Sequence, residues 1–221
     1  MGDLILLSER RALRQPTARS GGAPLRVAFF FDLACPFSYL AAEQVERLLG
    51  HAAWVPVAGD ALYRGEPWGD PRARESALAR AEGRAADLRL PLVCPDSFPA
   101  PTPLALRAAT YAAEVGAGRA FALAAARLAF CGGFELEDPE ILAEAAAAAG
   151  IRPDVCLAAA GDAGRDGSLH AAARGLLSRG VTELPAFRVG RRWRSGERGL
   201  AEATAAARSG LTREGPMAPV G

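Results

Sequence analysis

The sequence contains no lysine, so all 26 of its basic residues are arginines. They are offset by 25 acidic residues, which leaves a formal net charge of +1. This balance provides no electrostatic basis for binding nucleic acid, because phosphate backbones are bound through a marked excess of positive charge. We therefore expect no nucleic-acid partner, and we expect most arginines to lie on solvated helix faces.

Cysteine and histidine are few and widely dispersed. The four cysteines include no C-x-x-C pair, and the two histidines lie far apart in the chain. Zinc sites require ligands at short, characteristic spacings, so the pattern predicts no metal site. The even number of cysteines does not indicate a disulfide framework in a chain of 221 residues without a secretory signal.

Long hydrophobic runs are also missing. No segment approaches the ~20 consecutive apolar residues that a membrane-spanning helix needs. The short apolar patch within residues 1–7 has no basic residue before it and is too short for a signal peptide. We expect a cytoplasmic protein with reduced thiols and no membrane partner. Half of the residues are hydrophobic, which suffices for one good core or for a small domain with a large insertion.

The most informative residue is Cys35, because it stands between a predicted strand and a predicted helix. Residues 25–31 are almost all apolar, as in a buried strand, and helical periodicity runs from residue 39 to residue 49. Pro36 suits the first turn of a helix. Cys35 would then lie at the positive end of the helix dipole, which favours the reactive thiolate. The alternative is a buried cysteine that packs as a small apolar side chain.

The rest of the chain separates a strand-containing frame from a helical middle. A second strand is predicted over residues 52–57, then a helix over 168–178, a β-hairpin over 181–193 and a helix over 197–208. Between them, helices are predicted over residues 72–88, 104–115, 119–130, 139–149 and 153–160. We predict an α/β domain formed by residues 25–64 and 167–210, an inserted all-helical domain over 65–166, a mobile arm over 1–24 and a tail over 211–221.

Three segments resemble one family. Phe31–Leu40, which includes Cys35-Pro36-Phe37-Ser38, is similar to the opening segment of the thioredoxin fold in its DsbA-like branch, and Gly180–Phe187 is similar to the cis-proline segment. Gly196-Glu197-Arg198 resembles the family's G-x-D-R-L ending, with Glu in place of Asp. This branch contains DsbA-like oxidoreductases, kappa-class glutathione transferases and 2-hydroxychromene-2-carboxylate isomerases. The resemblance covers residues 25–208 and implies a central mixed sheet, an inserted helical domain and a cis Pro185 facing Cys35.

The resemblance also implies a thiol cofactor, either glutathione or another low-molecular-weight thiol. The backbone of Leu184 would pair with a cysteinyl peptide, and Arg198 would bind a carboxylate of the cofactor. The alternative for Glu197 and Arg198 is a solvated helix N-terminus. The residues that the resemblance assigns to cofactor binding are Pro36, Phe37, Leu184, Pro185, Gly196, Glu197 and Arg198.

Ser38 determines which chemistry is expected. A dithiol oxidoreductase needs a second cysteine at this position to resolve the mixed disulfide, and a hydroxyl cannot do this. A hydroxyl can donate a hydrogen bond that stabilises a thiolate. We therefore predict a DsbA-family thiol–disulfide oxidoreductase-like protein that acts through Cys35 alone, assisted by Ser38. Two alternatives stay open: a glutathione-dependent transferase or isomerase, and a non-catalytic module that binds peptides beside Pro185.

The expected partners are a small thiol and a substrate that is either a small molecule or a cysteine-containing protein. Homodimers are common in the transferase branch, so a homodimer is also an expectation. Cys94 lies in a proline-rich passage, where it is either a distant resolving cysteine or an unreactive residue of a packed loop. Cys131 and Cys156 lie in apolar helical contexts and are predicted to be core residues.

Overall fold

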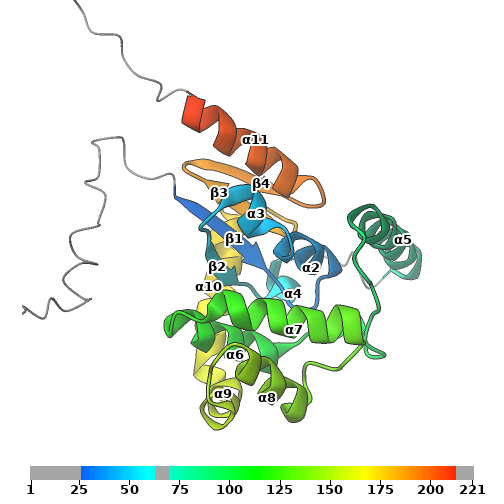
Figure 1. Cartoon of the computed structure of the whole chain (residues 1–221), viewed down its shortest axis with the longest axis vertical. Coiled ribbons are helices and arrows are strands. Elements are labelled where there is room, and N and C mark those ends of the chain that lie inside the picture. Colours follow the sequence, from blue (N-terminus) through cyan, green and yellow to red (C-terminus); the bar gives the residue numbers. More distant parts are fainter. Residues whose placement is uncertain (1–25, 63–69, 213–221) are drawn as a thin grey trace, which may run out of the picture.

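A four-stranded mixed sheet forms the centre of the computed structural model, which describes residues 26–62 and 70–212 and side chains up to residue 209 (Figure 1). Strand β1 (Val27–Phe31) pairs in parallel with β2 (Ala53–Pro56) and antiparallel with β3 (Ala186–Val189). Strand β3 pairs antiparallel with β4 (Arg192–Ser195). The predicted mixed sheet and its parallel pair are confirmed. The predicted arm and nearly all of the predicted tail lie outside the described residues.

The helices between β2 and β3 follow the predicted order. Several begin with a proline in their first turn, and Asp70 and Asp138 cap two of them by accepting hydrogen bonds from backbone N–H groups. Figure 1 shows α6 to α9 gathered at one end of the sheet, whereas α5 stands beside α2. The elements are α4 (Gly59–Leu62), α5 (Pro71–Leu88), α6 (Pro103–Glu114), α7 (Gly118–Gly132), α8 (Pro139–Ala148), α9 (Pro153–Ala160), η1 (Ala163–Arg165) and α10 (Asp166–Leu177).

Two of the predicted domain boundaries can be located in the structure. The boundary between residues 64 and 65 lies in the segment outside the described residues. The boundary between residues 166 and 167 falls at the beginning of α10. The division into a discontinuous α/β domain and an inserted helical domain therefore stays a prediction.

The single helix predicted after Cys35 is wrong, because two short helices stand there. Helix α2 (Pro36–Ala42) ends before α3 (Val45–Leu49) begins. At the break, the backbone N–H of Gln44 donates to Ala41 instead of Leu40, and the Gln44 side-chain amide donates to the Leu40 carbonyl at 2.8 Å. The side chain thus replaces a helical backbone hydrogen bond and lets the chain turn.

The predicted boundaries of the last elements also need correction. The strand predicted from residue 181 begins only at Ala186, because Pro185 has no N–H for a strand ladder. Residues 181–185 form a loop instead. The terminal helix α11 (Gly199–Thr212) begins two residues later and ends four residues later than predicted. The hairpin turn at Gly190 is confirmed, and its φ of 60° lies in the left-handed region.

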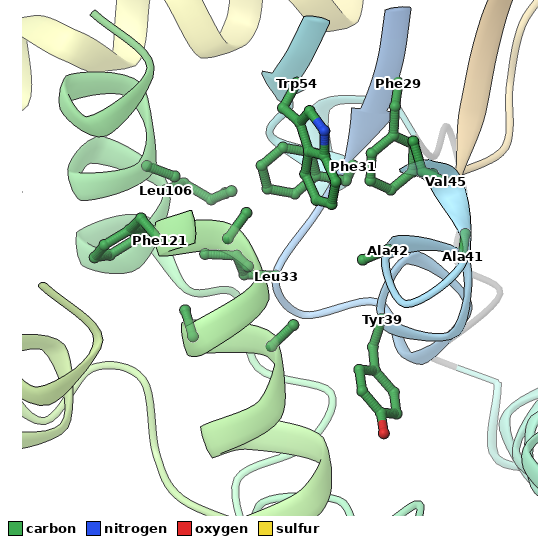
Figure 2. Packing of buried hydrophobic residues seen from close by; sticks show 14 of the residues in the cluster. Phe29, Phe31, Leu33, Tyr39, Ala41, Ala42, Val45, Trp54, Leu106 and Phe121 are labelled. Atoms are coloured by element: carbon green, nitrogen blue, oxygen red, sulfur yellow. The ribbon is translucent and has the colours of Figure 1, made fainter. Parts of the chain in front are cut away.

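The core holds the sheet in place from both faces. Phe29 is fully buried, with its ring 4.9 Å from Trp54 in an edge-on contact and 5.3 Å from Phe187 in a stacked contact. Figure 2 shows Phe29 and Trp54 on one side of this cluster and Phe121 across from them. Side chains alternate between the two faces of a strand, so Phe30 packs instead against a second cluster, which contains Cys35. The Cys35 loop follows directly at the carboxyl end of β1.

Candidate functional site

Cys35 is the N-cap residue of α2, directly after the turn that follows β1. Pro36 occupies the first turn of this helix, as predicted. The Cys35 side chain is only 3% exposed, and its thiol lies 4.0 Å from the carbonyl oxygen of Leu184, which it faces as a donor. The structure therefore brings together Cys35 and Leu184, which are 149 residues apart in the sequence.

Cys35 belongs to a compact buried cluster that includes part of α5. We refer to this set as the Cys35 cluster. It also includes alanines of α5 and α10, and within it Cys35 is only 3% exposed. The buried members are Cys35, Phe37, Val57, Leu62, Ala77, Ala81, Ala173, Leu176, Val181, Leu184 and Ala186.

The expected depression of the Cys35 pKa is wrong in this structure. Burial raises the pKa of Cys35 to about 11, and the negative charge of Asp32 raises it further. Hydrogen bonds from the Ser38 side chain and from the backbone of Ser38 and Phe37 lower this pKa without offsetting burial. A thiolate in this position would lose its hydration, which costs more than the first turn of the helix returns. The site as it stands holds a protonated, covered thiol.

Ser38 lies beside Cys35 and is also buried. Its hydroxyl oxygen accepts a hydrogen bond from the backbone N–H of Asp32 at 3.3 Å. This contact orients the Ser38 hydroxyl. A hydrogen bond from the hydroxyl to the Cys35 sulfur lowers the pKa of Cys35. Whether Ser38 assists Cys35 in catalysis stays a prediction.

Asp32 is a buried acid at the site that sequence reasoning did not single out. Its carboxylate accepts hydrogen bonds of 2.8 Å from the backbone N–H groups of Ala34 and Gly59. Burial raises the pKa of Asp32 to about 6, although both hydrogen bonds lower it. The available signal was an acidic residue at the end of an apolar strand, three positions before Cys35.

The proline loop and the segment after β4 meet next to Cys35. The Leu184–Pro185 peptide bond is cis. The Pro185 carbonyl accepts a hydrogen bond of 2.9 Å from the backbone N–H of Gly196. Gly196 has a φ of 74°, and the carboxylate of Glu183 lies where a side chain at position 196 would begin. Only glycine fits there without displacement.

Glu197 and Arg198 differ in their surroundings. The Glu197 carboxylate pairs with the Arg80 guanidinium of α5 at 2.6 Å. The Arg198 side chain is 89% exposed, and its guanidinium lies 3.9 Å from the carboxylate of Glu202. Glu197 is therefore part of a contact between α5 and the segment before α11, whereas Arg198 lies in solvent at the end of that segment.

Two hollows flank the site. A small groove lies between α2, α5 and α11, and its lining includes Phe37, Pro185 and Glu197 together with Arg84 of α5. A second small hollow is lined mainly by apolar groups, including Ala34, Phe98 and Phe130, with Glu135 among them. Sequence reasoning did not identify Arg84, because an arginine within an exposed helical stretch gives no local signal.

All four cysteines have free thiols. The predicted core position of Cys156 is confirmed, since it is fully buried. Cys131 is only partly buried, and its sulfur lies 3.1 Å from the Tyr39 hydroxyl, which corrects the prediction that it lies in the core. Cys94 is half-buried in the loop before α6. Whether it resolves Cys35 stays a prediction.

The described residues lack two other kinds of feature. Within residues 26–62 and 70–212, no group of three or more His, Cys, Asp or Glu side chains is arranged to hold a metal ion. No helix in the same part of the chain is long and apolar enough to cross a membrane.

Comparisons with solved structures show the same fold in several proteins. A 2-hydroxychromene-2-carboxylate isomerase has a TM-score of 0.71 at 16% identity, covering 85% of this chain and 97% of its own. A probable DsbA oxidoreductase from Streptomyces coelicolor has a TM-score of 0.68 at 22% identity, covering 89% and 94%. The cytosolic disulfide reductase DsbM from Pseudomonas aeruginosa, also solved with glutathione, has a TM-score of 0.62 at 16% identity, covering 86% and 100%.

Comparison with curated protein sequences finds no significant match. A family model described as the DSBA-like thioredoxin domain matches residues 26–202. This match spans the Cys35 turn, the helices between β2 and β3, the Pro185 loop and the hairpin that follows it. The chain therefore belongs to the DSBA-like thioredoxin domain family.

Proposed function

We propose that this protein catalyses thiol–disulfide exchange through the single nucleophile Cys35, with glutathione or a similar small thiol as the second substrate. The observation that supports this most strongly is the 4.0 Å approach of the Cys35 sulfur to the Leu184 carbonyl beside Pro185. A backbone edge next to a sulfur can hold a cysteinyl peptide in an extended pairing. Family membership supports an enzyme of this general kind.

The reaction has two balanced steps. The Cys35 sulfur attacks one sulfur of a substrate disulfide, forms a mixed disulfide and releases the other half as a thiol, which takes up the Cys35 proton. A small thiol then attacks the substrate sulfur of the mixed disulfide and releases Cys35. Its own proton returns to Cys35, and the product is a disulfide between the substrate and the small thiol. The external thiol is needed because Ser38 cannot attack a disulfide.

The covered thiol implies that Cys35 reacts only when the Cys35 cluster opens or when a ligand enters it. A cysteine that is only 3% exposed cannot meet a disulfide in line. Ser38 then has a defined part in this proposal: its hydroxyl stabilises the thiolate once the sulfur ionises. We further propose that the reaction takes place in the cytoplasm, where small thiols are kept reduced.

One observation favours a second candidate function. The mainly apolar hollow beside Ala34, with Phe98 and Phe130 in its lining, is suited to a hydrophobic or aromatic group. In a glutathione-dependent transferase or isomerase, the bound thiol would be the nucleophile. Cys35 and Ser38 would then only position its sulfur, and the substrate ring would lie in this hollow.

The two functions are separated by following the fate of Cys35 with oxidised glutathione. A variant that retains Cys35 and carries Cys94→Ser, Cys131→Ser and Cys156→Ser is incubated with it and analysed by intact mass. We expect one glutathione adduct, which reduced glutathione removes, and no adduct in the matched variant with Cys35→Ser. Ser38→Ala should slow adduct formation, because the thiolate loses a hydrogen bond. No adduct at Cys35 under any of these conditions would exclude the exchange mechanism.

A further inference from the structure

Two stripes of side chains lie next to each other along helix α5, one formed by alanines and one by arginines. The arginine stripe borders the groove beside Pro185. Ala77, Ala81 and Ala85 are four residues apart and buried. Arg80 and Arg84 are also four apart, so they lie on one neighbouring stripe. The first stripe helps to cover the Cys35 cluster. The second brings two guanidinium groups to the edge of the groove that also borders Pro185.

The charges along this groove do not cancel. Glu197 is the only acidic residue among the described residues that line it, and its carboxylate is already paired with Arg80 at 2.6 Å. Arg80 also donates to the Ser76 hydroxyl at 2.9 Å, which further holds it in place. Arg84 lines the groove, and its side chain has no ion pair or hydrogen bond within the described part of the chain. One positive charge is therefore left over at the groove.

We propose that Arg84 binds a carboxylate of the small thiol and makes the site selective for anionic thiols of the glutathione type. This inference rests on the proposed function, since it names the class of thiol that reacts at Cys35. A guanidinium matches a carboxylate with two parallel hydrogen bonds. The groove runs past Pro185, and the neighbouring Leu184 faces the Cys35 sulfur. A ligand in the groove can therefore extend from Arg84 towards Cys35. Arg84 would thus make the carboxylate contact that the family resemblance implied for Arg198, because Arg198 does not line the groove.

Binding is tested first without any sulfur chemistry. S-methylglutathione has both carboxylates but no thiol, and its affinity for the full chain is measured by calorimetry. We expect Arg84→Gln to weaken binding roughly tenfold, the loss expected for one charge-assisted contact. Arg84→Lys should restore part of it. Arg72→Gln removes the same charge from an exposed position on α5 and should leave the affinity unchanged. The inference fails if S-methylglutathione does not bind the wild-type protein, or if Arg84→Gln and Arg72→Gln behave alike.

Selectivity is then tested with thiols of different charge. Release of a Cys35 mixed disulfide is timed with glutathione, with neutral 2-mercaptoethanol and with cationic cysteamine. Arg84→Gln should slow only the reaction with glutathione, and equal slowing with all three thiols would contradict the role in selectivity. If the proposed exchange reaction is wrong but the binding inference is right, no mixed disulfide forms at Cys35. S-methylglutathione would then still bind in a manner that depends on Arg84.

Discussion

The Asp32 carboxylate accepts a hydrogen bond of 2.8 Å from the backbone N–H of Gly59 and so joins the loop before Cys35 to the beginning of α4. Its other oxygen accepts from Ala34 within the loop itself. A charge is thereby held in the interior, three residues from the sulfur, where water cannot solvate it. Two measurable consequences follow, one for stability and one for the thiol.

Stability should depend on pH through Asp32. Burial raises its pKa from 3.8 to about 6, so the folded state favours the protonated carboxyl. The folded protein therefore binds more protons than the unfolded chain between about pH 4 and pH 6, and the free energy of unfolding falls as the pH rises through this window. A shift of this size corresponds to about 3 kcal/mol.

The measurement is denaturant unfolding of wild type and Asp32→Asn between pH 4 and pH 7. The difference in unfolding free energy between the two proteins should change by about 2 kcal/mol between pH 4 and pH 7, and the wild type should lose stability as the pH rises. Asp87→Asn on the exposed face of α5 serves as the control, since Asp60 itself raises the pKa of Asp32. Parallel curves for wild type and Asp32→Asn would show that Asp32 titrates as an ordinary exposed carboxyl.

The Cys35 thiol should alkylate slowly at neutral pH. Its pKa is raised to about 11, so the thiolate fraction at pH 7 is far below that of an ordinary cysteine. In a variant with Cys35 as the sole cysteine, iodoacetamide labelling of the native protein should be slower than in urea and should accelerate up to high pH. Asp32→Asn should move the midpoint to lower pH, because it removes a nearby negative charge, whereas Asp60→Asn should not. Rapid labelling below pH 7 would instead establish a depressed pKa.

Gly196 should be intolerant of any side chain. Gly196→Ala would place a residue with a side chain at a φ of 74°, and the exposed Glu183 carboxylate would have to move into solvent to make room. We expect a loss of about 2 kcal/mol in unfolding free energy and slower disulfide exchange, because Gly196 donates to the Pro185 carbonyl. Gly150→Ala is the matched control, since Gly150 has a φ of 73° and no atoms within 4 Å of the added carbon. Both variants should lose similar stability because they share the same φ, and only Gly196→Ala should slow exchange; equal exchange rates in the two variants would contradict a role of Gly196 in the Pro185 loop.

Phe29 should be essential to the sheet. It is fully buried against Trp54 and Phe187, so Phe29→Ala leaves a cavity and should lower the unfolding free energy by about 3–5 kcal/mol. Phe134→Ala provides the comparison, because Phe134 is 47% exposed and its loss should cost about 0.5 kcal/mol or less. Thermal or denaturant unfolding reports both values. A small effect at Phe29 would mean that the core repacks around the missing ring.

Short-range sequence patterns were sufficient to predict most of the helices and strands. The proline and aspartate signals at the starts of α5 and α8 act within a few residues, so sequence position alone reveals them. The Cys35 turn and the Leu184–Pro185 loop were also recognisable, because each has a distinctive short sequence next to an apolar strand. The break at Gln44 was missed, since it depends on a side chain competing for one carbonyl group.

The order of residues by itself determined most of the strands and helices and the place of Cys35 at the start of α2, and the resemblance to a known family added the mixed sheet. Only the tertiary structure decided the state of that sulfur. The pKa of Cys35 depends on how much water reaches it, and α5, α10 and the loop at Leu184, all distant in sequence, exclude that water. The same holds for Arg84, which acquires a place at the groove only when α5 packs beside α2 and α11. Hydration and charge pairing belong to the folded arrangement, because they are set by atoms that the chain brings together only on folding.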